Sequence, residues 1–207
     1  MSEEVSGQNS KRYEVTAGLT LAVIAAVLAV VDLGGGKYGD DEIIGTNEKA
    51  NAYAWYQSKS LKETVIEQQK ATLEALVLAG AVTPEAKDAV AGMVTGMDAE
   101  ISRYKAEKRE ILEGSAAVGP EGQVLEKDGQ KGQITGAKEW EATLAVLGKA
   151  GDVFDLSTLF LQLSMVLGAI GLVIDLDKLK WSFYGATLLT GVLGAYFGVQ
   201  AFLIVGG

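Results

Sequence analysis

The sequence predicts an all-α membrane protein. Three transmembrane helices are expected to carry an extramembrane antiparallel helical hairpin, similar to a coiled coil, between the first and second spans. Residues 156–205 form an apolar run that only the charged segment 175–180 interrupts, and each half is close to the roughly 20 apolar residues that a spanning helix needs. Residues 16–33 form another apolar run, and the region between the two runs is polar. These observations favour membrane anchors at both ends of a soluble domain.

Composition narrows the available chemistry. The 207 residues include no Cys and no His, and the net charge is −9. A chain without these residues has no thiol nucleophile, no thiolate metal site and no imidazole base. An acidic surface repels nucleic-acid phosphates. We therefore expect no catalytic activity, no metal or other cofactor, no nucleic-acid partner and no small-molecule substrate.

The N-terminal part is expected to be a solvated tail over residues 1–15, followed by a transmembrane helix over 16–33. Lys11 and Arg12 stand before the apolar run, as in signal peptides and in uncleaved anchors, and we interpret the run as an anchor. Small residues recur at every fourth position and predict a face for close helix packing. They are Gly18, Ala22 and Ala26. Alanine also fills many membrane helices without such a role.

Residues 34–151 are expected to form the extramembrane helical domain. The glycines at 34–36 should end the first helix. Two long helices follow, over about 41–79 and 84–113, and the short connection after Gly80 requires an antiparallel return.

The seam of this hairpin is expected to lie along residues of the first helix that recur at helical spacing. Its apolar or small positions are Ile43, Ala50, Ala54, Leu61, Val65 and Leu76. Its polar positions are Asn47, Gln57, Gln68 and Thr72. A seam with so many polar positions is under-filled, so the hairpin should depend on other copies, on the third helix or on a partner.

The glycine-rich residues 114–134 are expected to be a flexible excursion or a two-stranded tip, with strand-like pieces at 123–125 and 133–135. A further helix should begin near residue 136 and continue into the second span, over 152–174.

The second span holds two polar side chains, Gln162 and Ser164. These side chains are candidates to line the pore of an oligomeric channel, which is the alternative function. An isolated amide more often forms hydrogen bonds between helices.

A turn over residues 175–182 leads to the third span, over 183–205. Small side chains at every fourth position of this span include a GxxxG motif and favour a true contact face. They are Ala186, Thr190, Gly194 and Gly198. Because basic residues are enriched on the cytoplasmic side of membrane spans, those of the tail and the turn favour a cytoplasmic tail and turn and a non-cytoplasmic helical domain. The ends of the helical domain carry an equal number of basic residues, so the number alone does not decide the orientation.

Residues 47–62 read NEKANAYAWYQSKSLK. This stretch resembles the segment after the first membrane helix in an uncharacterised bacterial membrane family, domain of unknown function four-three-three-seven, where an Asn, a Trp-x-Tyr-Gln-like cluster and a Lys-Ser-x-Lys run recur. The order of anchor, helical domain and terminal helical hairpin is similar too, and the resemblance is looser between Gly80 and Gly136. It implies a three-span protein of the bacterial inner membrane and supplies no activity.

Aromatic and basic side chains of this stretch are candidates for a docking patch, because Trp and Tyr dominate interface hot spots. They are Tyr53, Trp55, Tyr56, Lys59 and Lys62. Alternatively, the rings pack against the helix around Trp140. We expect a self-associating or accessory scaffold subunit of a membrane complex, with the lipid bilayer and either copies of itself or other membrane subunits as partners.

Overall fold

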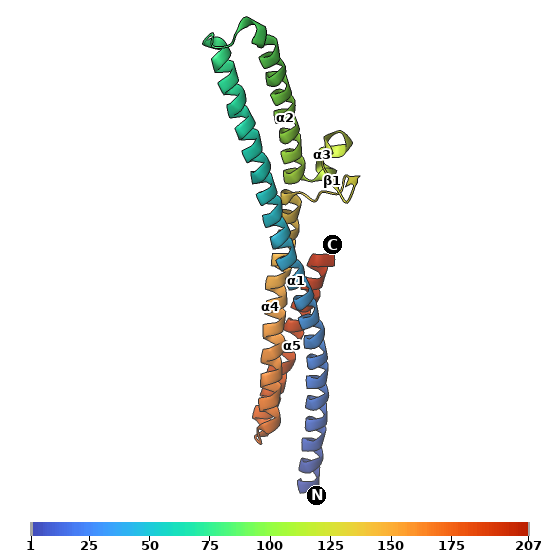
Figure 1. Cartoon of the computed structure of the whole chain (residues 1–207). Helices are drawn as coiled ribbons and strands as arrows, with labels where there is room; N and C mark the ends of the chain where they lie inside the picture. Colours follow the sequence, from blue (N-terminus) through green and yellow to red (C-terminus); the bar gives the residue numbers. More distant parts are fainter. Residues whose placement is uncertain (1, 207) are drawn as a thin grey trace. The chain divides into compact units, whose positions relative to one another are not determined.

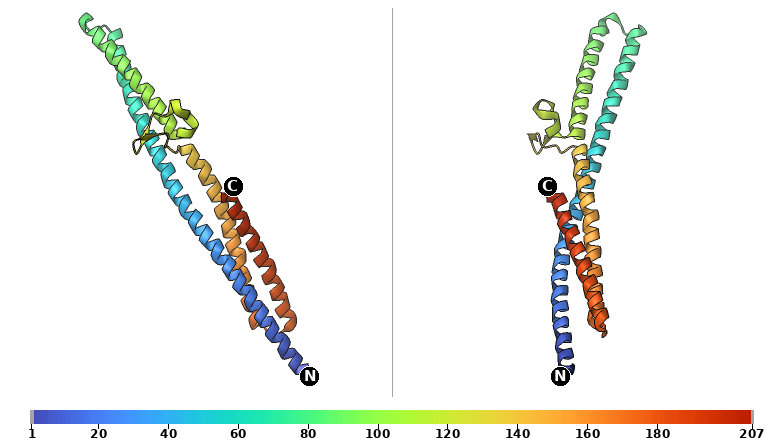
Figure 2. Two further views of the ribbon diagram at one scale, coloured as in Figure 1. Left: turned by 90° about the vertical axis from the view of Figure 1, so that its right-hand side faces the viewer. Right: turned by 180° about the vertical axis from the view of Figure 1, so that it is seen from behind.

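The computed structural model describes the backbone of residues 2–206 and the side chains of residues 12–206. Met1 and the Lys11 side chain lie outside the described part. The protein is helical, with one short β-hairpin (Figures 1 and 2). The elements in chain order are α1 (Ser2–Leu78), η1 (Pro84–Ala86), α2 (Lys87–Glu113), α3 (Ser115–Gly122), β1 (Glu126–Lys127), β2 (Gln130–Lys131), α4 (Ala137–Val173) and α5 (Asp177–Gly206).

The chain divides into two compact units. Unit 1 contains Met1–Ile43 and Ala145–Gly207, and unit 2 contains Ile44–Leu144. Among the described residues, three helices are long and apolar enough to cross a membrane, namely α1 from Arg12, α4 and α5. These three helices are therefore candidate membrane spans by length and composition.

Unit 1 packs parts of α1, α4 and α5 around a shared core. Buried members of this core are Ile24, Val31, Phe154, Leu161 and Ala201. Hydroxyl groups inside the unit donate to backbone carbonyls of α5, because a buried hydroxyl needs a partner. Ser157 Oγ donates to the carbonyl of Gly194 at 2.7 Å, and Ser164 Oγ donates to that of Thr187 at 2.7 Å.

Two expectations about α1 are wrong. Within the described residues the helix runs from Ser2, so residues 2–15 of the expected tail are helical, and it continues through residues 34–36. Gly34 explains the second result, because it is a site of close packing. A Cβ atom there would lie 2.5 Å from Cζ of Phe202 and 3.1 Å from Cε1 of Phe154. Favourable packing of two aromatic rings outweighs the low helix propensity of glycine.

Aromatic clusters mark two levels of unit 1. Tyr13 contacts Trp181, with ring centroids 5.5 Å apart, in the first cluster. Tyr38 contacts Phe154 at 5.8 Å in the second. Tyr13 and Tyr38 are separated by 25 residues of one helix, or about 37 Å at 1.5 Å per residue, which lies between the about 30 Å of the hydrocarbon core of a bilayer and the roughly 40–45 Å that includes its headgroup regions.

The connection between α4 and α5 is shorter than the expected turn over 175–182. The α5 helix begins at Asp177, whose carboxylate lies in the first helical turn. An acidic side chain there interacts favourably with the positive end of the helix dipole.

Unit 2 is built on α1, from Ile44 onward, and α2, which lie side by side and antiparallel (Figures 1 and 2). Gly80 has φ of +70° and closes the end of α1. The Gly80 N–H donates to the carbonyl of Val77 and the Ala81 N–H to that of Leu76, which is the Schellman arrangement.

The excursion between α2 and α4 differs from expectation. It contains α3 and a hairpin in which Glu126 pairs with Lys131. The strands lie closer to the tip than 123–125 and 133–135, because Asp128 and Gly129 have φ of 53° and 77°. Such values are typical of a two-residue type I′ turn, for which Asp-Gly is a preferred sequence. The Asp-Gly pair was the available signal for this turn.

The expected seam is wrong as well. The α2-facing side of α1 carries Lys59, Glu63 and Lys70, whereas the residues assigned to the seam are exposed. Within unit 2 we call these exposed residues the outer stripe. The outer stripe consists of Asn47, Ala50, Ala54, Gln57, Leu61, Val65, Gln68, Thr72 and Leu76. Leu61 and Val65 in this stripe are 67% and 48% exposed.

Candidate functional site

Unit 2 has a concave surface, a groove of about 620 Å³, which we call the Trp55 groove. Side chains of α1, α2, α4 and the hairpin tip line it. They are Ile44, Glu48, Asn51, Ala52, Trp55, Ile111, Glu126, Lys127, Ile134, Thr135 and Trp140. Two indole rings and aliphatic side chains lie beside charged groups of both signs, a combination found at protein-binding sites.

A buried carboxylate holds the hairpin that forms one wall of the groove. Glu110 is 0% exposed and accepts three hydrogen bonds. The donors are the Ser115 hydroxyl at 2.7 Å and the backbone N–H groups of Val124 and Leu125, both at 2.8 Å. Hydrogen bonds to an ionised acceptor are stronger than neutral ones. Glu110 therefore fixes the segment that leads into β1.

Ser115 extends this network to the return strand. Its Oγ atom accepts a hydrogen bond from the Ile134 N–H at 2.9 Å, and its own N–H donates to the Ile134 carbonyl at 2.8 Å. The glycine-rich excursion is thus attached to the end of α2 on both of its sides. Sequence reasoning missed Glu110 and Ser115, because a glutamate in a charged helix carries no local sign that its carboxylate is buried.

The predicted docking patch separates into different environments. Trp55 is 36% exposed in the groove, and Lys62 is exposed to solvent. Tyr53 donates a hydrogen bond to Oε1 of Glu141 in α4 at 2.9 Å. This bond raises the pKa of the Tyr53 hydroxyl, and burial and the negative charge of Glu141 raise it further. The Tyr53 ring therefore packs within the unit, as one of the two alternatives expected.

The other two patch residues also face their own unit. The Tyr56 ring lies 5.5 Å from Nζ of Lys108, and Lys59 forms an ion pair with Glu107 at 2.5 Å. The ammonium group of Lys59 also lies 5.6 Å from the ring of Tyr104. These contacts join α1 to α2, so Trp55 is the patch residue that lines the groove.

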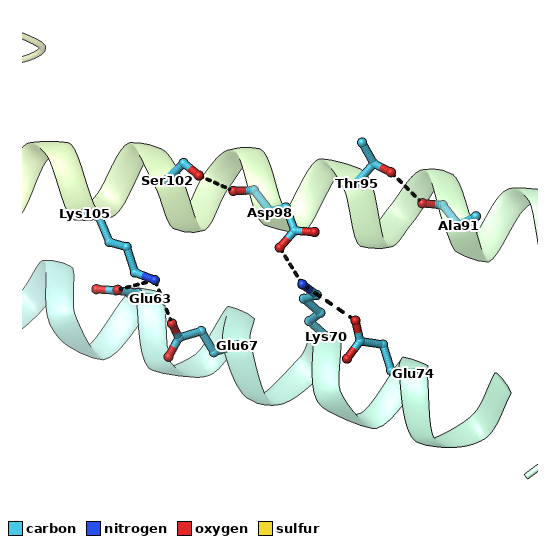
Figure 3. Close-up of polar contacts among 9 residues, drawn as sticks. All are labelled: Glu63, Glu67, Lys70, Glu74, Ala91, Thr95, Asp98, Ser102 and Lys105. Carbon is cyan, nitrogen blue, oxygen red and sulfur yellow. Dashed lines mark hydrogen bonds and ion pairs between the residues drawn. The ribbon is translucent and has the colours of Figure 1, made fainter. Parts of the chain in front are cut away.

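Ion pairs continue along the interface between α1 and α2 (Figure 3). Lys70 lies 2.5 Å from Asp98 of α2 and 3.6 Å from Glu74 of its own helix. The hydrogen bond to Asp98 is the main cause that raises the pKa of Lys70, against the opposing effect of desolvation. Lys105 lies 3.5 Å from Glu67 and pairs with Glu63, which also pairs with Lys108.

Comparison with known proteins identifies the family. The sequence model described as Domain of unknown function (DUF4337) matches residues 14–204, which is most of the chain. The chain belongs to this family. No curated protein and no solved structure gives a significant match. The DUF4337 assignment agrees with the resemblance found in residues 47–62 and assigns no activity.

In this DUF4337 chain, the small-residue repeat of α5 packs inside unit 1. A Cβ atom on Gly194 would lie 2.6 Å from Cγ of Leu161 in α4, and one on Gly198 would lie 2.8 Å from Cγ2 of Val31 in α1. Ala186 and Thr190 are half-buried. The contact partners of the two glycines are therefore helices of the same chain.

The small residues of α1 behave differently. Gly18, Ala22 and Ala26 are exposed, and among the described residues no heavy atom of another segment lies within 4 Å of a Cβ atom placed on Gly18. The two pore candidates also lie in different environments. Gln162 is exposed, and Ser164 is buried, with its hydroxyl donating to the carbonyl of Thr187. Ser164 therefore contributes to helix packing in unit 1.

Proposed function

We propose that the chain is a non-catalytic, self-associating or accessory scaffold subunit of a bacterial inner-membrane complex. Three helices anchor it, and unit 2 is a helical arm on the non-cytoplasmic side that binds other chains. The observation that carries the proposal is the apolar surface that unit 2 leaves exposed. It lies at two places, with Trp55 in the Trp55 groove and Leu61, Val65 and Leu76 in the outer stripe. Exposed apolar surface on a small domain is a common sign of an interaction site.

The anchoring part of the proposal is supported by the outer surface of unit 1. Large apolar side chains project outward from all three helices, as lipid contact requires, while hydroxyl groups bond inside. Examples of these exposed side chains are Val15, Leu19, Val23, Leu159, Val166, Leu189 and Val192. Lys11 and Arg12, which precede the apolar run within α1, and Lys178 support a cytoplasmic location for that end of the spans.

The absence of catalysis is supported by composition. A chain without His or Cys lacks the side chains used most often for general base catalysis and for thiolate chemistry. A scaffold requires none of these groups. It requires a rigid arm. In unit 2 the ion pairs join α1 to α2, and the hydrogen bonds of Glu110 hold the segment that leads into β1.

Gentle extraction of the native membrane, followed by measurement of complex mass and identification of every subunit, tests the proposal. We expect two or more copies of this chain, or a fixed set of other subunits with it. Trp55→Ala should remove a partner held by the groove, whereas Met93→Ala, which alters another exposed apolar side chain of unit 2, should not. A single chain that carries only lipid would contradict the proposal.

A further inference from the structure

The distribution of charge along α1 in unit 2 is one-sided. Between Ile44 and Ala79 the sequence has eight charged residues. They are Glu48, Lys49, Lys59, Lys62, Glu63, Glu67, Lys70 and Glu74. At about 100° per residue, all of them fall within a sector of roughly 140°. This sector faces α2 or borders that face, and the outer stripe lies on the opposite side of the helix, where no charged residue occurs.

Apolar side chains of α1 also face their own unit, as in an amphipathic helix, because Ala52, Tyr53 and Tyr56 pack in a core cluster with Ile111 of α2. In unit 2, the α2-facing side of α1 uses ion pairs such as Lys59 with Glu107 and Lys70 with Asp98. Residues of the outer stripe, such as Leu61 and Val65, form no ion pair with α2. The large apolar side chains of the stripe are Leu61, Val65 and Leu76, and removing them from water is favourable because they are 67%, 48% and 44% exposed.

We propose that the outer stripe is the site at which a second copy of this chain binds, with the two α1 helices parallel and in register. The proposal rests on the proposed function and names one partner of the arm. Copies anchored in one bilayer with the same orientation present their α1 helices in the same direction. In a parallel, in-register pair each residue of the seam faces its own counterpart.

This self-pairing explains why the stripe lacks charge. A charged residue at its centre would face an identical charge, and like charges across a seam repel. Gln57 and Gln68 are compatible with the same geometry, because an amide is both donor and acceptor and can bond to its own copy. Polar residues of this kind reduce stability but specify register in coiled coils.

The shape of the stripe also suits a second helix. A depression of about 580 Å³ lies on α1 along one edge of the stripe, between the stripe and the charged sector, and is lined by Thr64, Glu67, Gln68, Ala71, Thr72 and Ala75. Small side chains there allow a facing side chain to enter, as in knobs-into-holes packing.

The area corresponds to a weak interface whose two copies are held in one membrane. From Asn47 to Leu76 the stripe is about 44 Å long. With a contact width of about 10 Å, the pair buries roughly 900 Å² in total, which is below the about 1,200 Å² of stable specific complexes and in the range of weak, transient contacts. Anchoring in one membrane raises the effective concentration of the two copies, so that a weak contact is sufficient.

Cysteine cross-linking tests the pairing directly, because the chain has no Cys. Leu61→Cys and Gln68→Cys should each form a disulfide-linked dimer when isolated membranes are treated with a mild oxidant. A parallel in-register pair brings identical positions within the Cα separation that a disulfide needs. Met93→Cys, exposed on α2, is the matched control and should stay monomeric.

A second variant distinguishes a stable pair from cross-links that form when copies meet at random in the membrane. Leu61→Lys combined with Val65→Lys places identical charges at the centre of the seam and should weaken self-association about tenfold or more. Met93→Lys should not. Retention of helical content by circular dichroism would show that both variants are folded.

Absence of cross-links at Leu61 and Gln68, or equal cross-linking at Met93, would overturn the inference. If a fixed set of other subunits is found while these cross-links are absent, the inference fails and the proposed function stands. If the extracted chain is a single copy without protein partners, both fail.

Discussion

Removal of the Glu110 carboxylate is expected to release the hairpin tip of unit 2. Glu110→Ala leaves the N–H groups of Val124 and Leu125 without their acceptor. Each unpaired buried donor costs about 1–3 kcal/mol, and the Ser115 hydroxyl can turn to another acceptor. Because water enters near the groove, we take the lower part of the range and expect about 2–3 kcal/mol of local destabilisation.

Hydrogen exchange measured by mass spectrometry on the full chain in lipid nanodiscs is the suitable assay. Local opening free energy sets the exchange rate of a protected amide, so 2–3 kcal/mol corresponds to roughly hundredfold faster exchange. The acceleration should include the amides of Val124, Leu125 and Ile134. The amides in the centre of α2 should change little, because their helical hydrogen bonds remain.

Two further variants make this prediction refutable. Glu113→Ala removes a carboxylate one turn away that pairs with Arg109 and Lys138, and it should leave exchange at the tip unchanged. Glu110→Gln keeps an oxygen able to accept both amide bonds and should have a much smaller effect than Glu110→Ala. Unchanged exchange in Glu110→Ala would refute the assigned role of Glu110.

Three other predictions follow from the contacts. The folded protein favours protonated Lys70, and its pKa is therefore raised. The contribution of this ion pair to stability is complete below the ordinary pKa of about 10.5 and is lost as the pH rises through the raised pKa. Alkaline unfolding followed by circular dichroism should therefore depend less on pH in Lys70→Met. Gly194→Leu should destabilise unit 1 by about 3 kcal/mol or more through overpacking, whereas Gly18→Leu should be tolerated, as thermal unfolding in detergent would measure. Trp55→Ala should lower the amount of any groove-bound subunit in the purified complex, and an unchanged amount would exclude the groove as its site.

The sequence predicted the helical class, the family and the three apolar helices because these depend on composition and on apolar runs. The break at residues 34–36 was wrong for a tertiary reason. Glycine lowers helix propensity locally, but Gly34 gains contact with Phe154 and Phe202, which are distant in sequence. Single-sequence reasoning has no access to such contacts.

The orientation of α1 in unit 2 was not predictable for a related reason. Two sides of this helix have apolar residues at helical spacing, and the sequence pattern favours the side with Leu61 and Val65 as the seam. The actual side depends on pairing of Lys59 with Glu107 and of Glu63 with Lys108, which a pattern of hydrophobic residues does not reveal. For the candidate site, Trp55 could be identified from residue type. Its groove could not, because Glu110 and the hairpin create the facing wall.

Accessibility of the outer stripe in native membranes tests the central claim most directly. Leu61→Cys should react slowly with a membrane-impermeant thiol reagent while the arm is bound to another chain. It should react rapidly after detergent dissociates the complex. Ser102→Cys, at an exposed position of α2, should react rapidly in both states. Rapid reaction of Leu61→Cys in native membranes, equal to that of Ser102→Cys, would show that the stripe is uncovered and would contradict the account.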